Sequence, residues 1–165
     1  MTIEFKEFPK LALYGYSPEN AEAIWVRILS GVKPSSLKGD FVLIAEGMDA
    51  TTQQPLVVFV STVISAVPYF YYLSETGCIH ADNVFDVCKK ATLGWDWNWD
   101  ALVQMILLEH VIGNNSLHAK IFRVPQASIT IIRGNKIEIN SESFWEEIYN
   151  LTIINLTPNM PQNCC

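Results

Sequence analysis

The residues whose chemistry could support catalysis lie far apart along the chain. Cysteines and histidines occur at Cys78, Cys88, Cys164 and Cys165 and at His80, His110 and His118. The cysteines do not form two closely spaced pairs, so the spacing typical of a zinc site is absent. The sequence also contains no glycine-rich phosphate loop and no G-x-S-x-G nucleophile elbow. It therefore predicts no metal site and no cofactor.

Thr2 is the residue whose position suggests a nucleophile. An initiator methionine is normally removed when the second residue is small, and removal would leave the Thr2 hydroxyl beside its own α-amine. In that arrangement the amine serves as general base for the hydroxyl. The pattern is weak, because many proteins begin with Met-Thr. For this reason we keep an amidohydrolase that uses Thr2 only as an alternative function. No other residue is predicted to be catalytic.

Three tryptophans alternate with polar residues at Trp95, Trp97 and Trp99. The polar residues imitate the start of a calcium loop, but Ala101 and Leu107 replace the required glycine and glutamate, which excludes that site. The rings could form a stacking platform for sugars or bases. Alternatively, Asp and Asn residues cap a helix here while two of the rings pack in the core.

Two further groups are predicted to be structural. Glu109 and His110 are adjacent on a helix, so their side chains point about 100° apart and cannot easily face one substrate. A histidine in the last helical turn instead interacts favourably with the negative end of the helix dipole. His118 and Lys120 fall in a polar connection before Pro125, with no evident partner.

The composition limits the classes of protein and partner. Half of the 165 residues are apolar and 17% are charged, which excludes a disordered chain and indicates one domain. Eleven basic and seventeen acidic residues give a net charge of −6 without any basic run, so nucleic-acid and anionic-membrane surfaces are not expected. The first residues lack the apolar core of a signal peptide. We therefore expect a cytoplasmic protein with free thiols.

One apolar stretch resembles a membrane span. No charged residue occurs between Asp49 and Glu75. Polar residues and Pro68 interrupt the stretch, and its β-branched and aromatic residues favour strands. Central strands that are covered on both faces read as continuous apolar runs. We therefore predict two buried strands with a turn near Ser65–Pro68, and no membrane span.

The remaining pattern predicts an α+β fold with two layers of antiparallel sheet and helices grouped between the strands. A helix is expected from a Ser17 cap to Leu29, with Ala21, Ile24, Trp25 and Ile28 on its buried face. Further helices are expected after Asp82 and from Asn98 to Gly113. The predicted strands are Phe5–Tyr16, Phe41–Ala45, Leu56–Thr62, Tyr69–Leu73, Cys78–Ile79 and the hairpin of Ser128–Ile132 with Lys136–Ile139.

The C-terminal part of the chain is expected to end the domain. Phe144 and Trp145 are interpreted as a last docking segment. The single domain is predicted to cover residues 1–156, and residues 157–165 to form a flexible tail. The paired Cys164 and Cys165 are interpreted as part of that tail rather than as a lipidation or redox motif.

Four segments carry a resemblance to a known family. They are Leu37–Glu46, Val60–Tyr71, Asp100–Ile112 and Gly113–Ala127. In order and spacing they resemble the second half of the glutaminase domain of asparagine synthetase-like proteins, the class II glutamine amidotransferases, over about Ser17 to Trp145. The resemblance implies part of an N-terminal nucleophile hydrolase-type fold of antiparallel sheets and helices.

The departures from that family concern its active site. Thr2 stands where the family has its nucleophilic cysteine, and Pro18 where it has the aspartate that holds the glutamine amine. Ser61 and Thr62 replace a charged pair, and the arginine and the oxyanion Asn-Gly have no counterpart. Loss of an oxyanion donor alone typically costs about 10²–10³ in rate. Glutamine hydrolysis is therefore not expected.

The sequence accordingly favours a truncated, catalytically silent domain that acts by binding. The expected partner is another protein, such as a separate synthetase-type subunit or a peptide, or a second copy of the chain. Exposed aromatic side chains would supply the anchors. The candidates are Trp95, Trp97, Trp99, Tyr69 and Tyr71. A purely structural interaction protein remains a further alternative.

Overall fold

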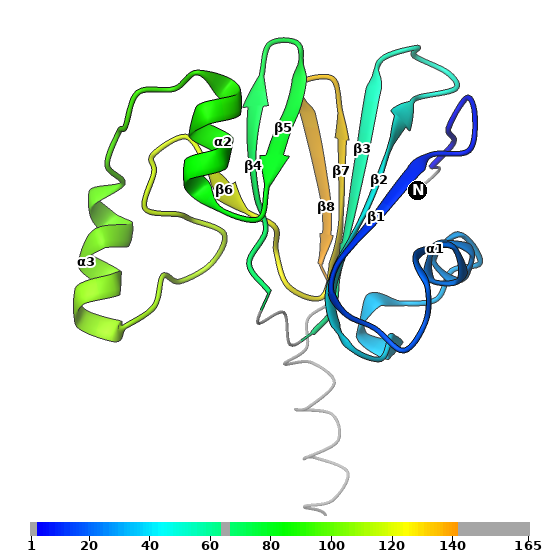
Figure 1. Cartoon of the computed structure of the whole chain (residues 1–165), viewed down its shortest axis with the longest axis horizontal. Coiled ribbons are helices and arrows are strands. Elements are labelled where there is room, and N and C mark those ends of the chain that lie inside the picture. Colours follow the sequence, from blue (N-terminus) through cyan, green and yellow to red (C-terminus); the bar gives the residue numbers. More distant parts are fainter. Residues whose placement is uncertain (1–2, 64–66, 142–165) are drawn as a thin grey trace, which may run out of the picture.

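The computed structural model of the chain describes residues 3–63 and 67–141. Among these residues, eight strands form two antiparallel sheets (Figure 1). The large sheet has the order β1 (Lys10–Tyr16), β2 (Asp40–Met48), β3 (Pro55–Ser61), β7 (Ser128–Arg133) and β8 (Lys136–Ser141). The small sheet has the order β5 (Gly77–Ala81), β4 (Phe70–Ser74) and β6 (Phe122–Arg123). The prediction of an α+β fold with two layers of antiparallel sheet is confirmed.

Within residues 3–63 and 67–141, three α-helices and one short 3-10 turn accompany the sheets. They are α1 (Ala21–Leu29), α2 (Val84–Ala91), α3 (Trp99–Leu108) and the 3-10 turn Pro34–Ser36. Helix α1 lies on one face of the large sheet and the small sheet lies on the other (Figure 1). Helix α2 packs on β4 and β5, and α3 lies beyond it at the side of the molecule.

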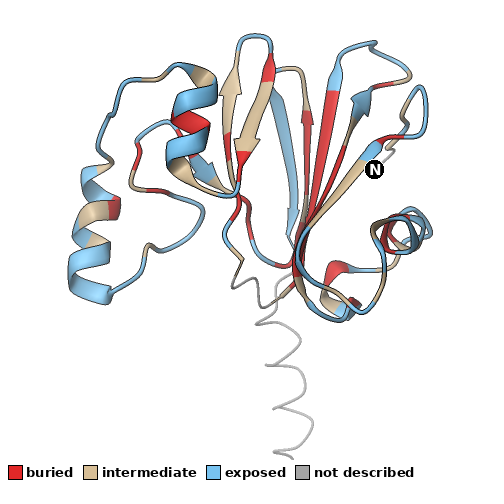
Figure 2. Ribbon diagram, viewed as in Figure 1, coloured by how far each residue is buried: buried red, intermediate tan, exposed pale blue. Residues whose placement is uncertain are grey.

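The alternation of side chains in the central strands explains the long apolar run. In β2, Phe41 and Leu43 pack toward α1, whereas Val42 and Ile44 pack toward the small sheet. Every residue of β3 from Leu56 to Ser61 is buried, because both faces of this strand are covered (Figure 2). The prediction of a buried strand is therefore confirmed for β3, whereas in β4 only Tyr71 is buried and the other residues are partly exposed. Part of the predicted turn near Ser65–Pro68 lies outside the described residues. No helix in the described part of the chain is long and apolar enough to cross a bilayer.

Helices α1 and α2 begin at different caps from those predicted. Asn20 caps α1 by accepting a hydrogen bond from the amide of Ala23 at 2.8 Å, whereas the Ser17 hydroxyl accepts one from Glu19 in a turn before the helix. Asn83, not Asp82, caps α2. In both helices, the residue that caps the N-terminus lies closer than the predicted one to the first helical turn with buried side chains. The predicted buried face of α1, formed by Ile24, Trp25 and Ile28, is confirmed.

Helix α3 begins as predicted but ends five residues before Gly113. The Asn98 side chain accepts from the amide of Ala101 at 3.1 Å and so caps the helix. At the other end, Glu109 adopts a left-handed conformation with φ 60°. The Gln104 side chain then accepts a hydrogen bond from the amide of Ile112 at 2.9 Å. This bond holds the chain in a turn after the helix.

Thr92 offers a test of backbone strain at the end of α2. This exposed, β-branched residue has φ 53° and ψ 38°, which L side chains other than Asn and Asp rarely adopt. We expect Thr92→Gly to raise the free energy of unfolding by about 0.5–1 kcal/mol, because glycine carries no steric penalty there. Urea denaturation measures the change. Thr51→Gly, at an exposed turn position without positive φ, should give no gain.

Candidate functional site

Helix α3 exposes most of its apolar surface. Ala101 is its one buried residue. The spacing of Trp99, Val103, Ile106 and Leu107 places them on a single side of the helix, which we call the outer α3 face; Ile106 is 70% exposed and Leu107 73%. Trp99 and Val103 are 67% and 51% exposed. Contiguous exposed apolar patches on monomeric proteins are often functional.

All three tryptophans singled out in the sequence are exposed, and Trp99 belongs to the outer α3 face. Trp95 is 38%, Trp97 44% and Trp99 67% exposed. Phe85 of α2 stacks on Trp95 at 5.1 Å between ring centroids, and Trp97 meets Trp95 edge-on at 5.2 Å. The interpretation in which two of the tryptophan rings pack in the core is therefore wrong, although the Asn98 cap that it included is present.

Tyr69 and Tyr71 lie elsewhere, between the two sheets. They are 2% and 3% exposed and pack against Phe59 of β3 at 5.9 and 6.0 Å between ring centroids. Both tyrosines thus hold the small sheet on the large one and are not accessible to a partner. In the sequence, the alternate positions of Tyr69 and Tyr71 did not indicate whether a second sheet would cover their side chains.

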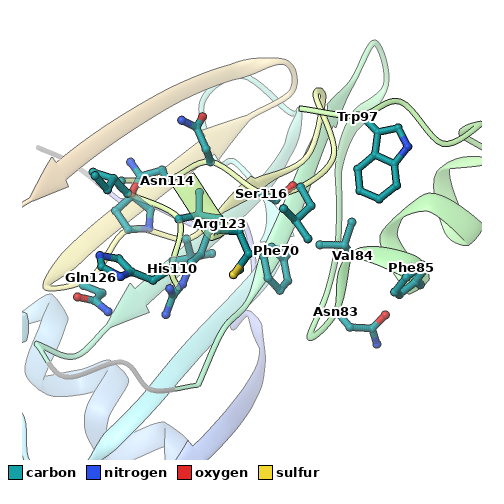
Figure 3. Close-up of a pocket in the computed structure, with 18 of the residues that line it drawn as sticks. Phe70, Asn83, Val84, Phe85, Trp97, His110, Asn114, Ser116, Arg123 and Gln126 are labelled. Carbon is teal, nitrogen blue, oxygen red and sulfur yellow. The ribbon is translucent and has the colours of Figure 1, made fainter. Parts of the chain in front are cut away.

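A large cavity lies between α3 and the rest of the molecule. Its volume is about 1170 Å³ (Figure 3). Its walls come from the start of α2, the inner side of α3 at Met105, the connection that follows α3, and the ends of β6 and β8. The walls include Phe70, Val84 and Trp97 and also the polar residues Arg123 and Asn114. Sequence reasoning missed this cavity, because its lining residues are distant in the chain.

The loops on both sides of α3 are joined by backbone hydrogen bonds and by His118. The amide of Asn98 donates to Leu117 at 3.0 Å, and that of Ala119 donates to Asp96 at 2.9 Å. His118 is 1% exposed; its Nε2–H donates to the Gly94 carbonyl at 3.1 Å and its Nδ1 accepts from the Lys120 amide at 3.2 Å. The expectation that His118 lacks a partner is therefore wrong. It is a buried residue whose two ring nitrogens both have partners, and it fixes the entry to α3.

Glu109 and His110 form no acid–base pair at the end of α3. Both are exposed, and His110 Nδ1 donates to the carbonyl of Leu108 at 2.7 Å. This bond satisfies one of the carbonyls left open at the helix terminus. The predicted structural role of His110 agrees with this contact.

A second polar cluster joins the two sheets at Glu46, His80 and Tyr69. His80 Nε2 donates to Glu46 Oε1 at 2.7 Å, and the Tyr69 hydroxyl donates to His80 Nδ1 at 3.0 Å. The Glu46 side chain is partly exposed and lines a smaller cavity of about 430 Å³ together with Lys10 and Cys78. Sequence reasoning did not find the cluster, since its members come from three separate segments.

Burial at this junction of the two sheets disfavours the charged forms of the phenols and the thiol there. Burial raises the pKa of the Cys78 thiol to about 12, and it raises that of Tyr71 to about 12. Burial and the neighbouring Tyr14 also raise the pKa of Tyr69 well above its ordinary value. Cys78 is thus a protonated thiol at neutral pH and a weak nucleophile. The hydrogen bonds of the cluster thus join the two sheets, and the neighbouring Cys78 is not an activated thiolate.

The stability of the fold should depend on the titration of His80. Burial lowers its pKa below 6.5, and Lys90 acts in the same direction, while Glu46 opposes both. Below about pH 6.5 the unfolded chain therefore binds a proton that the folded chain excludes, so stability should fall as the pH falls from about 6.5. His80→Gln should reduce this dependence. Urea unfolding of both proteins between pH 5 and 7 measures it, and equal slopes would contradict the assignment.

A separate loss of folding stability at lower pH is expected from the protonation of Asp49. Its carboxylate accepts hydrogen bonds from the Thr51 and Thr52 amides and from Arg133, which lower its pKa from 3.8 to about 2. Its contribution to stability is therefore present above about pH 4 and disappears as the pH falls toward 2. The two windows do not overlap, so the His80 titration can be measured on its own.

The described residues contain no group of three or more His, Cys, Asp or Glu side chains placed to hold a metal ion. Some of the residues singled out in the sequence lie outside the described residues: Thr2, Phe144, Trp145, Cys164 and Cys165.

Comparisons of the chain with models of protein families, with curated proteins and with solved structures give no match.

Proposed function

We propose that the protein is a non-catalytic, glutamine amidotransferase-like domain that acts as a binding or accessory protein. The observation that carries the proposal is the outer α3 face, formed by Trp99, Val103, Ile106 and Leu107. A helix with this sequence would ordinarily bury its apolar residues. An apolar surface of a partner would remove them from water.

The partner that the sequence resemblance implies is a separate synthetase-type subunit in a biosynthetic pathway; a peptide or a second copy of the chain is the alternative. Tryptophan is the residue most enriched among interface anchors, and Trp99 is the most exposed of the three in this region. We expect the protein to act in the cytoplasm, where Cys78 and Cys88, which are free thiols, remain reduced.

Two features support the absence of catalysis. Positions that carry the glutaminase machinery in the resembled family are Pro18, Ser61 and Thr62 in this chain, and Thr62 instead accepts a hydrogen bond from the amide of Phe41 at 3.1 Å within the large sheet. Desolvation of the partly buried Cys78 thiol raises its pKa to about 12, so the thiol is protonated at neutral pH. Purified protein should therefore release no ammonia from millimolar L-glutamine, and Thr2→Ala should behave identically.

The double variant Ile106→Lys/Leu107→Lys should abolish association through the outer α3 face. Association of this variant would bury two charges without partners at the centre of an apolar contact. Burial of an unpaired charge in an interface costs about 2–5 kcal/mol of binding free energy, so the two substitutions together should weaken binding by at least 100-fold. Sedimentation velocity measures the native and variant chains alone and with a purified synthetase-type subunit that lacks its own glutaminase domain.

The matched control is Val26→Lys/Leu29→Lys, which places the same charges on exposed apolar positions of α1, 61% and 54% exposed. This control should associate like the native chain. A native chain that stays monomeric and forms no complex with the subunit, or a control that dissociates equally, would contradict the assignment of the outer α3 face. Ammonia release from glutamine that disappears in Thr2→Ala would instead support the alternative enzyme.

A further inference from the structure

We propose that residues 144–156 of the chain dock in the cavity beneath α3. These residues lie outside the part of the chain that the structure describes, and they follow shortly after β8. The proposal concerns the inner side of α3 and does not depend on the outer α3 face. It assigns the cavity an occupant that belongs to the same chain.

The cavity lies where a packed interior would be expected. In the described part of the chain, α3 buries only Ala101 and shares no extensive contact with another helix or strand. The cavity between α3 and the rest of the molecule has a volume of about 1170 Å³ (Figure 3), and its walls include Phe70, Val84 and Met105. Protein interiors are close-packed and contain few voids larger than a water molecule. A space of this size beside apolar side chains is therefore expected to hold an apolar occupant.

Strand β8 leads the chain to the wall of this cavity. Ile139 and Ser141, the last residue of the strand, both line it. The register of β8 on β7 places Ile139 opposite Thr130 and Ile137 opposite Ile132, which packs between the two sheets. Alternate side chains of β8 thus face the small-sheet side of the large sheet, where Ile137 and Ile139 are 38% and 40% exposed. The residues after Ser141 therefore begin at the cavity.

The short connection favours the chain's own residues as the occupant. Phe144 is the third residue after Ser141. It lies within about 11 Å of Ser141, because an extended chain spans at most about 3.6 Å per residue. A link this short gives the segment an effective concentration on the order of millimolar at the cavity. A second copy of the chain or a free ligand would have to match that concentration to displace it.

The composition of residues 144–156 matches an apolar site. Apolar residues of this kind are usually buried, because apolar surface is driven out of water. The cavity at the end of β8 offers apolar walls against which they can pack. Eight of the thirteen residues are apolar, and they are Phe144, Trp145, Ile148, Tyr149, Leu151, Ile153, Ile154 and Leu156.

The test measures how far two methionine methyl groups are shielded from solvent in the full chain. Met105 lines the cavity and is 38% exposed, whereas Met48, at the end of β2, is 42% exposed and does not line it. A soluble gadolinium chelate increases the relaxation rate of every methyl signal that it can approach. The substitutions Met105→Leu and Met48→Leu assign the two signals. Without an occupant in the cavity, the two rates should increase to a similar extent.

Docking of the segment should separate the two signals. Binding pockets typically cover roughly 70% or more of their occupant, and the walls lose accessible surface in the same contact, so the increase for Met105 should be about 3-fold smaller than for Met48. Nuclear Overhauser contacts should also join the Met105 methyl group to the ring of Trp145.

Phe144→Asp/Ile148→Asp should abolish the difference between the two methionines and the contacts to Trp145. Two carboxylates would otherwise lie against apolar walls without partners, which is unfavourable. The matched control is Asn159→Asp/Gln162→Asp, which adds the same charges beyond the segment and should leave Met105 shielded.

Equal relaxation of Met105 and Met48 in the native chain would overturn the proposal. Shielding of Met105 that persists in Phe144→Asp/Ile148→Asp would do the same. Shielding that falls on dilution would mean that a second copy supplies the segment, and contacts of Trp145 with Ile106 would place it on the outer α3 face; both results contradict the proposal. The two methionine signals and the Trp145 contacts of the native chain remain decisive if a variant fails to fold.

Discussion

Replacing Phe59 with alanine is expected to lower the free energy of unfolding by about 3–5 kcal/mol, the range for deleting a buried aromatic ring. Phe59 lies in β3 at the centre of the large sheet and is fully buried. Its ring meets three rings of the small-sheet region, those of Tyr69, Tyr71 and His80, at centroid distances of 5.9, 6.0 and 5.3 Å. Loss of the ring would leave a cavity where the two sheets meet.

Urea unfolding followed by circular dichroism measures this loss. Phe59→Leu serves as the control, since it retains most of the apolar volume and should cost clearly less than Phe59→Ala. Because Phe59 also packs on His80, the alanine variant should weaken the Glu46–His80 contact. A loss below about 1 kcal/mol for Phe59→Ala would show that the two sheets do not depend on this contact.

Replacing His118 with alanine is expected to loosen α3. In the part of the chain that the structure describes, α3 shares no extensive contact with another helix or strand. Its position rests on the loops before and after it, and His118 bonds to Gly94 and Lys120 there. Removing the imidazole leaves two polar groups without their partners, at about 1–3 kcal/mol for each one that remains buried.

Amide hydrogen exchange measures the effect directly. We expect the amides of α3 to exchange about 10–100-fold faster in His118→Ala, and those of β2 and β3 to change less, since the large sheet has its own core. His110→Ala is the matched control, because it removes an exposed histidine from the end of the same helix. Equal exchange of α3 in both variants would show that His118 does not hold the helix.

Several elements of the fold followed directly from local patterns. The Gly134-Asn135 pair predicted the β7–β8 hairpin, and the structure pairs Arg133 with Lys136 across it. The spacing of Ile24, Trp25 and Ile28 predicted the buried face of α1. These features depend on backbone conformation and on residue period, which neighbours in the sequence determine.

Other features depended on contacts between distant segments. Tyr69, Tyr71 and the three tryptophans are all aromatic residues at alternate positions, yet the tyrosines are buried and the tryptophans exposed. What separates them is whether a second sheet covers the strand, and alternation in one segment carries no information about that cover. The partner of His118 was missed for the same reason, because Gly94 lies on another loop.

The sequence by itself determined the positions of the three described helices and of every described strand except β6 (Phe122–Arg123), because residue period and turn residues are local properties. It did not determine all of their ends, since β1 begins at Lys10 rather than Phe5 and α3 ends at Leu108. The net charge of −6 is a sum over residues and is also known from the sequence. The tertiary structure alone decided which apolar residues remain in contact with water: α3 exposes Ile106 and Leu107, whereas β3 buries Val58 and Val60. Burial is set by how segments distant in sequence pack together, and so the outer α3 face, the cavity beneath it and the Glu46–His80–Tyr69 cluster became evident only in three dimensions.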